Sequence, residues 1–124
     1  MKRLALFISL FALCIFVENS WAIEKSTIMK TVDDLAVEIE NGKEISGIKA
    51  DAYDPYVFVM EEGGLMLVHP KFAGKDYKKE LPAIYDALMQ AGPEGTWIKY
   101  VWDDKEKNSY VKRTKNNLIV GSGY

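Results

Sequence analysis

His69 is the only histidine of the 124-residue chain and the side chain best suited to proton transfer or ligand binding. It follows an apolar run that ends at Val68 and precedes Pro70. An unperturbed imidazole titrates near neutral pH, so it can serve as an acid, a base or a ligand donor. A lone histidine at a strand end is about as often a packed residue as a functional one. Position alone therefore leaves the role of His69 open.

Common catalytic and metal-binding constellations need partners that this sequence lacks. The only cysteine, Cys14, lies in an N-terminal segment that we expect to be removed, so a multi-ligand imidazole or thiolate metal site is excluded. No serine motif accompanies His69, and the glycines at 63, 64 and 74 lack the spacing of a phosphate-binding loop. We therefore expect no enzymatic activity, no metal and no cofactor.

A short C-terminal stretch is rich in aromatic residues with a polar edge: Trp97, Tyr100, Trp102 and Tyr110. The period of two along a strand puts Tyr100 and Trp102 on one face of a sheet and Trp97 on the other. Together with Lys107, Lys112 and His69, these groups could surround one concave spot with hydrogen-bond donors, as in a pocket for a small anion. The alternative is that the rings simply fill the core.

The N-terminal segment has the anatomy of a secretory signal peptide. Lys2 and Arg3 precede an apolar run, and small residues around Ala22 suit a cleavage site. We expect residues 1–22 to be a cleaved signal and residues 23–124 to form one domain in the periplasm. The apolar run is short for a membrane span, which needs roughly 20 residues, so an uncleaved anchor is the less favoured alternative. Loss of the cysteine also fits a periplasmic domain better than a disulfide-rich extracellular one.

The charge balance argues against nucleic acid as a partner. The formal net charge is −2 at pH 7, so no broad positive field exists to recruit nucleic acid or anionic lipid. The small basic run at 112–115 is typical of a solvated strand end.

In the first half of the mature chain, the pattern predicts a helix followed by a hairpin. Apolar residues recur at helical spacing over residues 24–41, and Gly42 follows as a stop signal. Strands are expected at 56–60 and 65–69, joined by a glycine-containing turn at 61–64.

In the second half, a shorter helix is expected at 81–88, with Pro82 in its first turn. Three strands follow, at 96–102, 109–112 and 117–121, separated by polar turns at 103–108 and 114–116. The whole order favours an α+β domain with a five-stranded antiparallel sheet, a long N-terminal helix and a second short helix. The long helix would seal one face, and a small cavity could form on the other.

Two stretches resemble the single-Cache family, which comprises the extracytoplasmic PAS-like sensor domains of chemoreceptors and histidine kinases. YVFVMEEGGLMLVHPKFAGKD, residues 56–76, is similar to the family's strand, turn, strand and His-Pro pattern. GTWIKYVWDDKEKNSYVKRTKNNLIVGSGY, residues 95–124, is similar to its Tyr-x-Trp, Lys-x-x-Tyr and terminal Gly-x-Gly pattern. With the leading helix, the resemblance covers nearly all of the mature chain.

This resemblance implies a pocket for a small carboxylate such as acetate, pyruvate or lactate, on the sheet face away from the long helix. The residues that it assigns to the pocket are Tyr56, Phe58, His69, Tyr100, Trp102, Lys107 and Tyr110. Because the sequence ends where the sensor pattern ends, the resemblance also implies a free-standing module that signals through a membrane receptor or histidine kinase.

The alternative is a non-catalytic interaction protein with a vestigial pocket. Such a protein would dock on a membrane receptor or form a homodimer through its N-terminal helix. A filled cavity and exposure of Ile28, Val32 and Leu35 on that helix would favour this second hypothesis.

Overall fold

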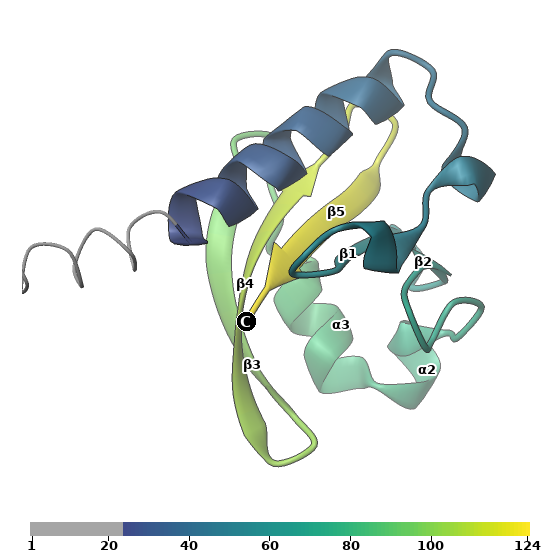
Figure 1. Cartoon of the computed structure of the whole chain (residues 1–124). Coiled ribbons are helices and arrows are strands. Elements are labelled where there is room, and N and C mark those ends of the chain that lie inside the picture. Colours follow the sequence, from purple (N-terminus) through teal and green to yellow (C-terminus); the bar gives the residue numbers. More distant parts are fainter. Residues whose placement is uncertain (1–23) are drawn as a thin grey trace, which may run out of the picture.

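A five-stranded antiparallel sheet with helices on both faces forms the framework of the protein (Figure 1). The structure is a computed structural model, which describes residues 24–124. The strands are β1 (Val57–Glu61), β2 (Met66–Val68), β3 (Thr96–Trp102), β4 (Lys105–Arg113) and β5 (Leu118–Gly123). Their order in the sheet is β2-β1-β5-β4-β3. The predicted α+β class and sheet are confirmed, whereas the predicted signal peptide lies outside the described residues.

The N-terminal helix packs across one face of the sheet (Figure 1). Its described part spans residues 24–40, and Gly42 follows with a φ of 101°, a backbone conformation that favours glycine. The apolar stripe of the helix, which includes Val32 and Leu35, is buried against Val59 and other residues of the central strands. Each such side chain contributes roughly 1.5–3 kcal/mol when fully buried. None of the helices within residues 24–124 is long and apolar enough to cross a membrane.

Two short helices, α2 (Tyr77–Glu80) and α3 (Pro82–Leu88), pack on the opposite face and enclose a second core. Asp76 caps α2, because its Oδ1 accepts a hydrogen bond of 3.2 Å from the backbone N–H of Lys79. The helix predicted at 81–88 is present as α3. The four-residue α2 is too short to show a periodic pattern, and the sequence did not predict it.

An irregularity in β2 decides where His69 points. Val59 pairs with Val68, whereas Met60 pairs with Met66, so β2 contains one extra residue, Leu67. Met66 packs in the core beneath α3, while Leu67 and Val68 both pack on the side of the N-terminal helix. Because the bulge interrupts the alternation, His69 returns to the α3 side of the sheet.

The β3–β4 hairpin is longer than predicted. β3 covers the predicted residues 96–102, but β4 begins at Lys105 rather than at residue 109. The predicted long turn at 103–108 is wrong, because only Asp103 and Asp104 form it, with φ values of 51° and 62°. Such left-handed conformations match the twist of a two-residue hairpin, and aspartate adopts them more readily than most residues do.

Candidate ligand-binding site

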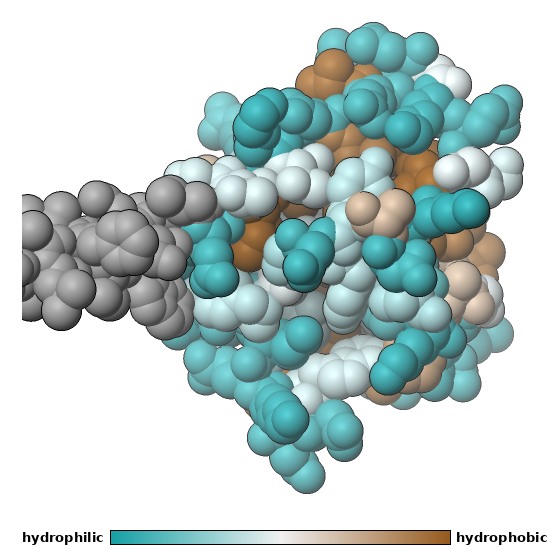
Figure 2. Space-filling view, in the orientation of Figure 1, coloured by the Kyte–Doolittle hydropathy of each residue, from teal (hydrophilic) through white to brown (hydrophobic). Residues whose placement is uncertain are grey.

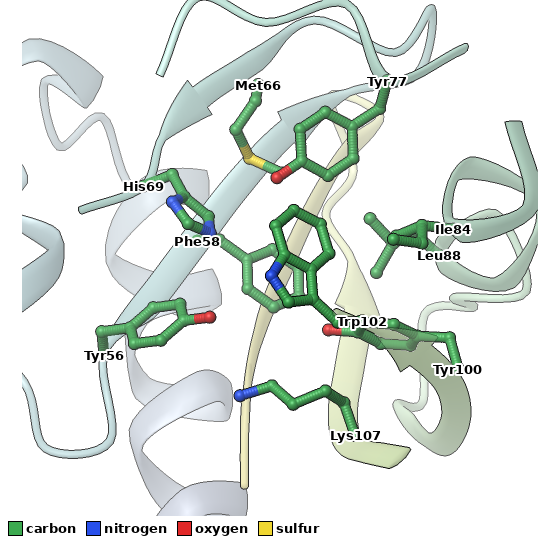
Figure 3. Close-up of a pocket in the computed structure, with 10 residues that line it drawn as sticks. All are labelled: Tyr56, Phe58, Met66, His69, Tyr77, Ile84, Leu88, Tyr100, Trp102 and Lys107. Carbon is green, nitrogen blue, oxygen red and sulfur yellow. The ribbon is translucent and has the colours of Figure 1, made fainter. Parts of the chain in front are cut away.

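A small cavity lies between the sheet and the α2–α3 segment (Figure 3). Its walls come from four strands and both short helices, or from residues just beside them: Tyr56, Phe58, Met66, His69, Tyr77, Ile84, Leu88, Tyr100, Trp102 and Lys107. The free volume inside is about 10 Å³, close to the room that one water molecule requires. As the resemblance implied, this cavity is on the face away from the long helix.

Six of the seven residues assigned to the pocket from the sequence line this cavity: Tyr56, Phe58, His69, Tyr100, Trp102 and Lys107. Tyr100 and Lys107 are direct partners in the β3–β4 ladder, so they face the same side of the sheet. Phe58 lies over Gly121 of β5, where a side chain would collide with its ring. The structure thus brings these six residues together, and binding of a ligand by them remains a prediction.

Tyr110 does not line the cavity, and its assignment to the pocket is wrong. Its hydroxyl donates a hydrogen bond of 3.1 Å to Asp33 Oδ1 on the N-terminal helix, and its ring centroid lies 5.6 Å from that of Trp97. Lys107 and Tyr110 are three positions apart in β4, and an odd spacing in a strand places two side chains on opposite faces. Lys112 is also on the helix side, paired with Asp33 at 3.2 Å.

The hydrogen bonds of His69 define which ring nitrogen faces away from the backbone. Its Nδ1 accepts hydrogen bonds from the backbone N–H groups of Lys71 and Phe72, each 3.1 Å long. In the neutral ring the proton is therefore on Nε2, where it can be donated to a ligand. Burial, together with the positive charges of Lys107 and Lys71, lowers the pKa of His69 from 6.5 to about 4, and burial is the largest of these causes. At neutral pH the ring is an uncharged donor.

Three tyrosines contribute phenol groups to the cavity, and sequence reasoning missed one of them. Tyr77 is only 2% exposed, and its hydroxyl makes no hydrogen bond with any residue between 24 and 124. Burial raises the pKa of Tyr77, of Tyr56 and of Tyr100, so all three hydroxyls keep their protons. The hydroxyl of Tyr100 is 3.1 Å from Ser109 Oγ. The cavity therefore holds at least one phenol hydroxyl that is free to donate.

Lys107 supplies positive charge to a cavity without acidic residues. None of the ten lining side chains is a carboxylate, and Lys107 forms no ion pair within the described part of the chain. Its ammonium group lies 5.7 Å from the ring centroid of Tyr56 and points into the cavity (Figure 3). A negatively charged ligand would neutralise this charge and accept hydrogen bonds from the surrounding groups.

The apolar walls were not predicted as parts of the site. They are Met66 of β2 and Ile84 and Leu88 of α3. The helical spacing of 81–88 identified an apolar stripe, but periodicity does not reveal which partner a stripe covers. In the sequence, only the capping residue Asp76 directly before Tyr77 indicated that a helix begins there, and nothing indicated that Tyr77 lies in the cavity.

Comparisons with solved structures show a similar fold. No family model matches the sequence, and no curated protein matches it. The crystal structure of a methyl-accepting chemotaxis protein from Vibrio parahaemolyticus RIMD 2210633 has a TM-score of 0.50 and 14% sequence identity, covering 86% of this chain and 91% of that chain. This similarity shows the fold, and membership of the Cache family remains a prediction.

Proposed function

We propose that this protein is a sensor-type module that binds a small carboxylate in the cavity and leaves it chemically unchanged. The single observation that carries the proposal is the absence of an acidic partner for Lys107 among residues 24–124, in a cavity rich in hydrogen-bond donors. Removing a carboxylate from water is costly unless it gains a counter-charge and hydrogen bonds. Lys107, the Nε2–H of His69 and the hydroxyl of Tyr77 are groups of the required kind.

Two further observations support a role in sensing. The sequence resembles the Cache family, and the fold is similar to that of a chemotaxis receptor chain. We infer that the protein acts in the periplasm, to which the signal peptide expected at 1–22 would direct it. The proposed partner that reads the occupied state is a membrane receptor or a histidine kinase.

The decisive experiment is a thermal-shift titration with acetate, pyruvate and lactate, each compared with its uncharged amide. A ligand that binds only the folded state stabilises it by about 2.7 kcal/mol at a hundredfold excess over its dissociation constant. At least one acid should raise Tm with logarithmic dependence on its concentration, and its amide should not. If no short carboxylate raises Tm, the proposal fails.

Two control variants separate the cavity from the rest of the molecule. Lys107→Ala should abolish the shift, whereas Lys105→Ala removes the same charge from an exposed position of the same strand and should keep it. Tyr110→Phe changes a tyrosine on the opposite face, so it should lower stability by about 1 kcal/mol and leave ligand binding unchanged. If Lys107→Ala and Lys105→Ala reduced the ligand-induced rise in Tm equally, the rise would depend on the net charge of the protein and not on a specific site.

The second candidate is the interaction protein with a vestigial pocket, favoured by the free volume of only about 10 Å³. The other feature expected of it is not found, because Ile28, Val32 and Leu35 are buried by the protein's own sheet. The face in Figure 2 is mostly hydrophilic, with small separate hydrophobic areas. The larger exposed apolar residues are distributed over several elements: Met29, Val37, Leu65, Val101 and Tyr124.

A further inference from the structure

Trp102 occupies the middle of the cavity (Figure 3). Its ring centroid lies 5.2 Å from that of Phe72, 6.2 Å from that of Tyr77 and 6.3 Å from that of His69. The indole is nearly parallel to the rings of Tyr77 and His69, with interplanar angles of 27° and 28°. One large side chain from the end of β3 thus contacts the segment that follows β2 and the first residue of α2.

The position of this indole limits what the cavity can hold. The remaining free volume of about 10 Å³ accommodates one water molecule, and even the smallest carboxylates are several times larger. A side chain must therefore move before such an anion can bind. Moving the indole would free more room than moving any other lining side chain, because tryptophan is the largest of them.

Three of the other aromatic walls, Phe58, Tyr77 and Tyr100, are held more firmly than Trp102. Phe58 is in a central strand and is 4% exposed, and Tyr77 is 2% exposed. Tyr100 is close enough to hydrogen-bond to Ser109. Trp102 is only partly buried and lies at the end of edge strand β3, and its indole N–H makes no hydrogen bond to any residue that the structure describes. The next two residues, Asp103 and Asp104, form the hairpin turn, so the strand ends at Trp102.

We propose that Trp102 is the gate of the cavity and the residue that sets the size of the acid it accepts. The indole moves away from the rings of Phe72 and Tyr77, and a carboxylate takes its place beside Lys107 and His69. This inference rests on the proposed function for the identity of the ligand. The apparent affinity then equals the intrinsic affinity multiplied by the fraction of molecules in which the indole has moved. A smaller side chain at this position brings the apparent affinity up to the intrinsic one.

A series of straight-chain carboxylates from formate to hexanoate tests the gate. Calorimetry or stopped-flow binding would compare wild type with Trp102→Ala and with Trp102→Phe, and Trp97→Phe on the opposite face is the matched control. Trp102→Ala should shift the preferred acid to a longer chain, with a gain of tenfold or more for the longest acid relative to the shortest, and should speed association. The preferred acid length and the association rate of Trp102→Phe should lie between those of wild type and Trp102→Ala. Both quantities should be the same in Trp97→Phe as in wild type. The same size preference and association rate in wild type and Trp102→Ala would overturn the gate while leaving the proposed function intact.

A second measurement needs no ligand. Protein labelled with 5-fluorotryptophan would be studied by fluorine NMR, with Trp102→Phe to assign the resonance. Trp102 should show two resonances or exchange broadening on the microsecond to millisecond timescale, and Trp97 should show neither. If no carboxylate binds but Trp102 exchanges, the proposed function and the role of Trp102 in selecting acids fail, whereas the opening of the cavity by the indole stands. If no carboxylate binds and Trp102 gives one sharp line without exchange, the gate fails as well.

Discussion

The imidazole of His69 and the ammonium group of Lys107 line the same cavity, although they come from distant parts of the sheet (Figure 3). His69 follows β2 at one edge, and Lys107 is in β4, three strands away in the order of the sheet. The charge of Lys107 helps to lower the pKa of His69, because two positive charges in one poorly hydrated space repel each other. The pair therefore combines one permanent cation with one neutral donor.

The lowered pKa of His69 predicts a specific loss of stability in acid. The unfolded chain takes up the proton near pH 6.5 and the folded chain only near pH 4, so the unfolded state binds more protons between these values. The free energy of unfolding should fall as the pH falls from about 6.5 to 4, and this contribution should level off below pH 4. Because the ring is partly exposed, we expect a loss of about 1–2 kcal/mol.

The matched variant for this measurement is His69→Asn. The asparagine oxygen can accept the backbone N–H groups of Lys71 and Phe72 as Nδ1 does, but it does not titrate. Urea unfolding of both proteins from pH 7 to pH 4 would isolate the contribution of the imidazole, because the carboxylates are common to both. If the free energy of unfolding changed with pH in the same way in both proteins, the predicted effect of the lowered His69 pKa would be contradicted.

Gly121→Ala should disturb the floor of the cavity. A Cβ at this position would collide with the ring of Phe58, which must then shift. We expect the free energy of unfolding to fall by about 1–3 kcal/mol. Adding Phe58→Leu should recover part of the loss, because the smaller side chain makes room. Gly47→Ala, where a Cβ meets no atom within 4 Å, is the control and should change stability by less than about 0.5 kcal/mol.

The N-terminal helix offers a test of what covers its apolar stripe. Leu35 is 1% exposed and packs on the sheet, so Leu35→Ala should cost about 2–5 kcal/mol in the free energy of unfolding. Val37 is 52% exposed, and Val37→Ala should cost less than about 0.5 kcal/mol. Tm should not depend on protein concentration. A Tm that rises with concentration, together with a large loss from Val37→Ala, would instead support a homodimer through this helix.

The sequence predicted best those elements whose pattern is local. The strand at 96–102 alternates side chains between two faces, and the helix over residues 24–40 repeats its apolar residues at helical spacing. The first half of β4 was missed because its charged residues lack an apolar face, although they pair fully with β3. Tyr110 was assigned to the pocket because the Lys-x-x-Tyr pattern was carried over as a unit. The strand period could not separate its two ends in the sequence, because Lys107 was expected in the turn at 103–108 and only its pairing with Tyr100 places it in β4.

The sequence by itself determined the α+β class and the order of the five strands and the two predicted helices. It also determined that aromatic rings, one imidazole and one lysine are present for a cavity. These properties follow from propensities and periods that act between near neighbours. Only the tertiary structure decided the direction of His69, which depends on the bulge at Leu67 and hence on pairing with β1. Tertiary packing also brought Tyr77 to the cavity and put the indole of Trp102 at its centre. Free volume depends on how side chains from distant segments pack against one another, and no local pattern records that.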